Sequence, residues 1–174
     1  MMSKVGWTYP AALLGLDAAA NFALALLLFG AWTPGYSQAA NLVSELGTAV
    51  APFALAFNLI GFVLPGLQIA ALGAGLGMEF RHKGLPVWMP GLVMVSGAAW
   101  ALLGLFPASS GLYPSPVTTV HNVLMLVSLG TFVLAALAWP YVAVRDAAWR
   151  SFITPSMMLG LATIASFALP SRIP

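Results

Sequence analysis

The chain has 174 residues, of which 61% are hydrophobic and only 6% are charged. Soluble domains devote about 25% of their residues to charged side chains, so this chain cannot cover a globule in water, and its hydrophobicity excludes a disordered chain. Its six basic residues are scattered and its net charge is +2, which argues against a nucleic-acid partner. Because it has no cysteine, it has no disulfide and no thiolate metal ligand. The composition predicts an integral membrane protein.

Five apolar segments are long enough to cross a bilayer as helices, which takes about 20 residues each. In chain order they cover residues 10–32, 51–78, 86–106, 117–143 and 151–169. The connections between them are short and leave no room for a soluble domain. We therefore expect an all-α helical bundle of five transmembrane helices, with residues 1–174 forming a single transmembrane domain.

The distribution of basic residues predicts the orientation. Five of the six, Lys4 among them, precede the first segment or lie in the connections 79–85 and 144–150, whereas Arg172 alone lies on the other side. Cytoplasmic loops retain Lys and Arg. The N-terminus is therefore expected in the cytoplasm and the C-terminus outside.

The first external connection contains a candidate surface helix over Ser37–Gly47, ended by the glycine. Its apolar residues recur at helical spacing. They are Ala39, Leu42, Val43 and Leu46. We expect this short helix to lie on the membrane surface or on the bundle.

Polar residues within a transmembrane segment are expensive and therefore informative. Asp17 lies in the first segment, with Asn21 one turn later on the same face. We expect Asp17 to be an interior group that is hydrogen bonded to its neighbours. A proton-relay or ion site is the alternative.

The second segment carries Asn58, Gly61, Pro65 and Gln68 along one stripe. Pro65 is expected to kink the helix, and both amides are expected to face protein. The stripe then serves either as contact between helices or as the wall of a ligand cavity. The ligand-binding candidates are Asp17, Asn21, Asn58 and Gln68.

The sequence identifies no cofactor and no metal site. His82 and His121 fall near opposite membrane faces, about a bilayer thickness apart, which argues against one haem held by both. No lysine lies within the five segments, which excludes a retinal Schiff base.

Ser44, Glu45 and His121 are all expected near the outer membrane face. A serine, an imidazole and a carboxylate can act as nucleophile, base and orienting group. The alternative is a polar lock in which Glu45 contacts His121 and holds the surface helix over the bundle. We expect this Glu45–His121 contact.

A set of residues in fixed order resembles the bacterial membrane family called domain of unknown function 998, over about residues 30–140. The set comprises Tyr36-Ser37, Ser44-Glu45-Leu46-Gly47, Asn58, Gly61, Gly104-Leu105-Phe106-Pro107 and His121. More distantly, the chain is similar to the eukaryotic Frag and Sfk type membrane proteins, which are linked with lipid organisation. The resemblance implies a compact bundle in the bacterial inner membrane, with marked residues near one face. Those would be Ser44, Glu45, Gly47, Asn58, Phe106, Pro107 and His121.

The family resemblance implies six transmembrane helices, whereas five are predicted here, so we expect one face of the bundle to be open to a partner. The favoured function is a non-catalytic membrane protein, either an accessory subunit of a larger membrane complex or a lipid-contacting bundle. The alternatives are a lipid- or small-ligand-binding protein and an intramembrane hydrolase or acyl-transfer enzyme using Ser44, Glu45 and His121. Expected partners are membrane lipids and either another membrane protein or further copies of this chain.

Overall fold

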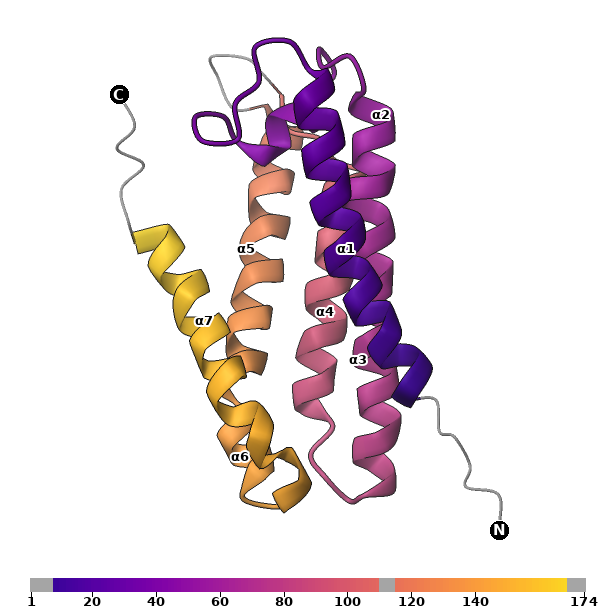
Figure 1. The fold of residues 1–174 in the computed structure, drawn as a ribbon, viewed down its shortest axis with the longest axis vertical. Coiled ribbons are helices and arrows are strands. Elements are labelled where there is room, and N and C mark those ends of the chain that lie inside the picture. Colours follow the sequence, from indigo (N-terminus) through magenta and orange to yellow (C-terminus); the bar gives the residue numbers. More distant parts are fainter. Residues whose placement is uncertain (1–7, 110–114, 169–174) are drawn as a thin grey trace.

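The computed structural model describes residues 8–109 and 115–168. Within these ranges the chain is helical and contains no strand, which confirms the all-α prediction (Figure 1). The long helices are α1 (Thr8–Trp32), α3 (Leu64–His82), α4 (Trp88–Leu103), α5 (Pro116–Leu137) and α7 (Ile153–Ala168). The short elements are η1 (Val43–Gly47), α2 (Ala54–Phe57), η2 (Asn58–Val63), α6 (Trp139–Ala143) and η3 (Ala147–Phe152).

Three of the helical stretches are long and apolar enough to cross a membrane, namely Pro10–Trp32, Ala54–His82 and Pro116–Ala143. The other two long helices, α4 and α7, have 16 residues each, fewer than the roughly 20 that a perpendicular crossing takes. These apolar helices are those of an integral membrane protein. The number of five transmembrane helices remains a prediction.

The long helices pack in chain order, α1 on α3, α3 on α4, α4 on α5 and α5 on α7. Among the described residues, α1 and α7 make no extended contact with each other. Figure 1 shows α7 leaning away from the rest of the bundle. The helices therefore form an open arc, and its two ends are α1 and α7.

Small residues bring α3 and α4 close together. A Cβ atom added at Gly66 would meet the backbone of Ala101, and one added at Gly97 would meet the backbone of Ala70. At Gly73 the added atom would lie 2.6 Å from the Met94 nitrogen. Glycine allows this approach of helix backbones in membranes, and Gly66, Gly73 and Gly97 serve that purpose here.

The irregularity predicted at Pro65 takes the form of a π-helical segment, η2, just before the proline. Proline lacks the N–H that would bond to the carbonyl four residues earlier, and its ring crowds that carbonyl. A wider π-helical turn is one way in which a helix accommodates such a disruption. Helices α2 and α3 thus continue one another across η2.

The predicted fourth segment, 117–143, is divided in the structure. Helix α5 ends at Leu137 and α6 begins at Trp139. Pro140 lies in the first turn of α6, where its missing N–H costs no hydrogen bond. The proline therefore explains why a single apolar run forms two successive helices.

Two apolar cores lie at opposite ends of the bundle along the length of its helices. We call the end that carries residues 33–53 and 104–109 the upper end, as drawn in Figure 1, and the end that carries residues 83–87 and 144–152 the lower end. The upper core consists of Ala25, Phe29, Leu46, Phe57, Phe62 and Leu103. The lower core consists of Phe80, Leu85, Met89, Ala135, Trp139 and Val142.

The predicted surface helix over Ser37–Gly47 is mostly wrong, because only the 3₁₀ helix η1 forms there. The Asn41 side chain accepts a hydrogen bond from the Ser37 N–H at 2.8 Å, and Glu45 accepts one from the Leu42 N–H at 3.0 Å. Such side-chain bonds compete with the backbone bonds of a longer helix. Of the predicted apolar face, Leu46 is buried, whereas Ala39 and Leu42 are exposed.

Candidate functional site

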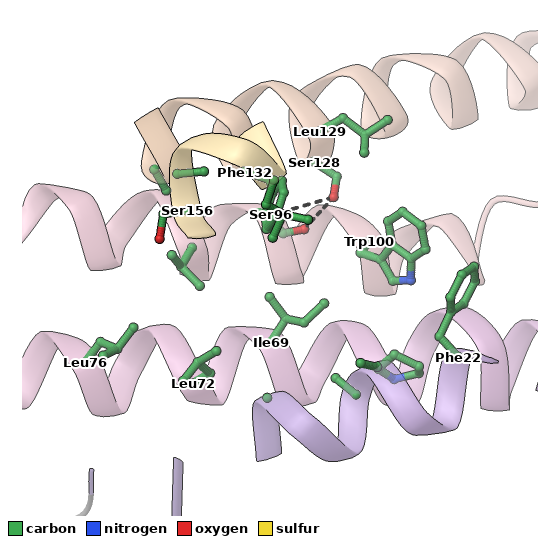
Figure 2. Close-up of a pocket in the computed structure, with 18 of the residues that line it drawn as sticks. Phe22, Ile69, Leu72, Leu76, Ser96, Trp100, Ser128, Leu129, Phe132 and Ser156 are labelled. Carbon is green, nitrogen blue, oxygen red and sulfur yellow. Dashed lines mark hydrogen bonds between the residues drawn. The ribbon is translucent and has the colours of Figure 1, made fainter. Parts of the chain in front are cut away.

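A cavity of about 560 Å³ runs along the inside of the arc, from Trp100 beside the upper core to Trp139 in the lower core. Figure 2 shows the side chains that line it around Ser96 and Ser128. All five long helices contribute to its wall. The lining is apolar except for the hydroxyl groups of Ser96, Ser128 and Ser156 and the indole nitrogens. The cavity is therefore suited to a hydrocarbon and not to a polar solute.

The entrance to the cavity lies between α1 and α7. Ala19 of α1 and Leu159 of α7 are the exposed residues of the lining, and the other lining residues are buried or half-buried. These two residues come from the two helices that do not pack on each other. The cavity consequently opens sideways, in the direction where lipid would lie if the helices cross a membrane.

Two hydroxyl groups form the polar part of the wall, and both residues are buried (Figure 2). Ser128 Oγ donates to the Ser96 carbonyl at 2.9 Å, and the two Oγ atoms are 3.4 Å apart. Since the single Ser128 proton goes to that carbonyl, Ser96 is the donor between the hydroxyls. Both groups are thus satisfied without a ligand.

Trp100 forms the upper end of the cavity. Its ring packs edge-on against Phe22, with centroids 5.4 Å apart, and its Nε1 donates to the Gly61 carbonyl at 3.4 Å. In an α-helix that carbonyl would accept the N–H of residue 65, which is a proline here. The indole N–H therefore donates to a carbonyl for which Pro65 has no N–H.

The ligand-binding candidates from the sequence lie elsewhere. Asn21 Nδ2 donates to Gln68 Oε1 at 3.1 Å and so joins α1 to α3. Asn58 is buried at the upper end. The prediction that Asn58 and Gln68 face protein is confirmed. None of these amides lines this cavity, and the Asn21–Gln68 bond serves as contact between helices, the first of the two roles considered for the stripe.

Asp17 is not the interior group that was predicted. Its side chain is exposed, although the next residue, Ala18, is 2% exposed. Ala11, Ala18 and Ala25 are the buried residues of this stretch, and position 17 is turned about 100° from that face. The Asp17 carboxyl group forms no hydrogen bond with the described residues.

Asn58 fixes the loop that precedes its own helix. Its Nδ2 donates to the Gly47 carbonyl at 2.9 Å. A Cβ atom at position 47 would collide with Asn58 Oδ1. Gly47 is therefore needed for the close approach of the Asn58 side chain.

The expected Glu45–His121 contact is also wrong. Glu45 accepts hydrogen bonds from the Leu42 N–H at 3.0 Å and from Asn41 Nδ2 at 2.8 Å. The first bond follows from its place three residues after the N-cap Leu42, where a glutamate reaches back to the free N–H of the N-cap. His121 instead is buried and bonds to the Phe106 carbonyl through Nδ1 at 2.8 Å.

Ser44 forms no hydrogen bond with His121 in the described part of the chain, so the structure does not bring nucleophile and base together. Ser44 and Glu45 line a shallow upper pocket of about 860 Å³, together with Tyr36 and Asn122. Burial, and secondarily the charge of Glu45, raises the pKa of Tyr36 above its ordinary value. His121 does not line this pocket.

At the lower end, Lys83 joins α3 to the segment before η3. Its Nζ lies 3.3 Å from Asp146 Oδ2 and 3.3 Å from Glu79 Oε1, and 5.5 Å from the centre of the Trp149 ring. The hydrogen bond with Asp146 is the main reason why the pKa of Lys83 is raised. His82 is exposed here.

The family described as protein of unknown function (DUF998) matches residues 18–172. The chain belongs to this family. The comparisons with curated proteins and with solved structures gave no match. In this DUF998 protein, Glu45, Gly47, Asn58, Phe106 and His121, which carried the resemblance, take part in contacts that hold the upper loops.

Sequence reasoning missed the residues that line the cavity of this DUF998 chain, Ser96 and Ser128 above all. A signal was present, because each is a hydroxyl group in the middle of an apolar segment. The rule that singled out Asn58 and Gln68, that polar groups within a membrane need a partner, applies equally to serine. It does not tell which helix supplies that partner.

Proposed function

We propose that this protein binds the hydrocarbon chain of a membrane lipid in the cavity between α1 and α7. The observation that carries the proposal is the sideways entrance at Ala19 and Leu159, which leads into an apolar cavity. A chain that enters there exchanges contacts with other acyl chains for contacts with Ile69, Leu72 and Phe132. Packing against these side chains, and not the hydrophobic effect, would then favour binding.

The size of the cavity agrees with this ligand class. Its volume of about 560 Å³ lies within the range of roughly 300–1,000 Å³ that is usual for small-molecule sites. The Ser96 hydroxyl donates to Ser128 Oγ and the Ser128 hydroxyl donates to the Ser96 carbonyl, so an apolar chain can cover both without leaving a buried donor unpaired. The protein is in this view a lipid-contacting bundle that acts without chemistry of its own.

Charge supports an orientation in which the lower end is cytoplasmic. Arg81, Lys83, Arg145 and Arg150 all lie at the lower end, whereas the charged residue of the described upper end is Glu45. Lys4 and Arg172, which also entered the sequence prediction, lie outside the described residues. By the positive-inside rule, we infer that the upper end faces the outside of a bacterial inner membrane.

The test is photo-crosslinking in vesicles made of phosphatidylcholine with a diazirine near the middle of one acyl chain. A parallel sample carries the same diazirine on a free fatty acid, to distinguish a lipid chain from a soluble acid. Label is expected on Ile69, Leu72 or Phe132. Ala19→Phe, which narrows the entrance, should reduce that label, whereas Ala23→Phe, on an exposed position of α1 outside the cavity, should not.

Label confined to outward-facing side chains, with none on the cavity wall, would refute the proposal. So would equal labelling of the wall in the Ala19→Phe and Ala23→Phe variants. If a transmembrane helix of another protein is crosslinked to the cavity wall instead of lipid, the accessory-subunit function replaces lipid binding.

A further inference from the structure

The exposed side of α1 carries a regular pattern of its own. Seven residues follow one another at alternating spacings of three and four, and every one of them is exposed. They are Pro10, Leu13, Asp17, Ala20, Leu24, Leu27 and Ala31. Alternation of three and four is the heptad pattern with which two helices pack into a left-handed pair. We call these seven residues the α1 seam.

Asp17 is the one polar residue of the α1 seam. It lies seven residues, or about 10 Å along the helix, inside the apolar stretch Pro10–Trp32. An ionisable side chain within a membrane normally faces protein or a water-filled cavity, but in the isolated chain Asp17 is exposed and lines neither of the two pockets described above. None of the described residues of the single chain covers it, so we expect a partner in the membrane to do so.

We propose that two copies of this chain associate through the α1 seam, with their Asp17 side chains facing each other. Copies inserted with the same orientation present parallel α1 helices, and a heptad position then faces the same position of its partner. Two carboxyl groups that share a proton make a strong hydrogen bond. A second copy thus places a carboxyl group opposite Asp17 at the same depth in the membrane.

The α1 seam lies on the opposite side of α1 from the cavity. The α1 residues that line the cavity are Gly15, Ala18, Ala19 and Phe22. With 100° between successive residues, their mean direction is about 180° from that of the seam. Association through the seam would therefore leave the entrance at Ala19 open. The inference does not depend on lipid binding, and either can fail alone.

Cysteine crosslinking in native membranes tests the seam directly, because the natural chain has no cysteine. Ala20→Cys and Leu24→Cys on the seam should each give a disulfide-linked dimer on mild oxidation. Ala19→Cys is the matched control, since it is exposed at the same depth on another side of α1. The amount of disulfide-linked dimer in this variant should not exceed what random collision produces.

The role of Asp17 is tested in the Ala20→Cys background. Asp17→Leu should weaken self-association about tenfold, the factor that corresponds to one interhelical hydrogen bond of about 1.4 kcal/mol, whereas Asp17→Asn should keep most of it because amides also pair. Helicity and thermal unfolding of both variants check that the chain is folded. Equal crosslinking at positions 19 and 20, crosslinking to a different protein, or no effect of Asp17→Leu would overturn the inference.

Discussion

The amide of Asn58 and the backbone of Gly47 fit together as a pair. Asn58 Nδ2 donates to the Gly47 carbonyl at 2.9 Å, and Asn58 Oδ1 occupies the space that a Cβ atom at position 47 would take. The bond ties the end of η1 to the first turn of η2, eleven residues later. The pair explains why a glycine and an asparagine stand at these two positions.

Gly47→Ala should therefore destabilise the protein. The new methyl group would displace the Asn58 side chain and break a buried hydrogen bond, at a cost of about 1–3 kcal/mol. The free energy of unfolding, measured by denaturant titration in detergent micelles, checks this. Gly130→Ala in α5 is the control, because a Cβ atom there meets nothing within 4 Å. A Gly47→Ala variant as stable as Gly130→Ala would contradict the steric argument.

His121 holds the connection after α4. Because the Phe106 carbonyl can only accept, Nδ1 of His121 carries the proton in this bond. His121→Ala should leave that carbonyl without its side-chain donor and lower stability by about 1–3 kcal/mol. Hydrogen exchange should show faster opening of residues 104–109, with the amides of α3 unaffected. Unchanged exchange at 104–109 would show that the imidazole does not hold this connection.

The stability of the lower end should fall at acid pH. The backbone N–H of Ala148, and then Lys83, lower the pKa of Asp146 below its ordinary value of 3.8. A carboxyl with a lowered pKa contributes stability above its unfolded pKa, and that contribution is lost as the pH falls through the lower folded value. Protection of residues 144–150 in hydrogen exchange should hold above about pH 4 and decline below it.

The Lys83–Asp146 pair also makes the stability of the lower end fall at alkaline pH. The pKa of Lys83 is raised above 10.5, mainly by its bond with Asp146, so its contribution is present below that value and lost as the pH rises through the folded pKa. Asp146→Asn keeps an acceptor for the Ala148 N–H but removes the charge. It should abolish the loss of stability in acid and weaken the loss in alkali, because Glu79 still lies 3.3 Å from Lys83. Acid and alkaline losses that are unchanged in Asp146→Asn would assign the pH dependence to other groups.

The orientation of the protein in the membrane can be measured by labelling cysteines placed at two exposed valines. Val50 at the upper end is 76% exposed and Val144 at the lower end is 82% exposed. In intact cells, a membrane-impermeant maleimide should label Val50→Cys, and should label Val144→Cys only after lysis. The reverse pattern would place the lower end outside and contradict the positive-inside inference.

The sequence predicted the apolar helices and failed at the features that tertiary contacts decide. Hydropathy located α1 and the run from α2 to α3 to within a few residues, because bilayer thickness imposes one length on every segment. It missed the break before Trp139, because a proline within an apolar run leaves the hydropathy high although it ends the helix.

The candidate site was harder to predict than the fold. Asn58 and Gln68 were correctly expected to face protein, because amides need partners in hydrocarbon. Glu45 and His121 were expected to meet because both residue types are scarce in this chain and both lie at the same depth. Each side chain instead bonds to a backbone group, Glu45 to the Leu42 N–H and His121 to the Phe106 carbonyl. The cavity itself depends on the order in which helices pack, which no local pattern contains.

The most direct test of lipid binding is the quenching of Trp100 fluorescence by acyl chains brominated near their middle. Trp100 is one of six tryptophans, so its contribution is taken as the difference between the natural chain and Trp100→Phe. We expect that difference to be strongly quenched in brominated vesicles, relieved by Ala19→Phe and unchanged by Ala23→Phe. A Trp100 contribution that is equally bright in brominated and ordinary vesicles would mean that no lipid chain enters the cavity.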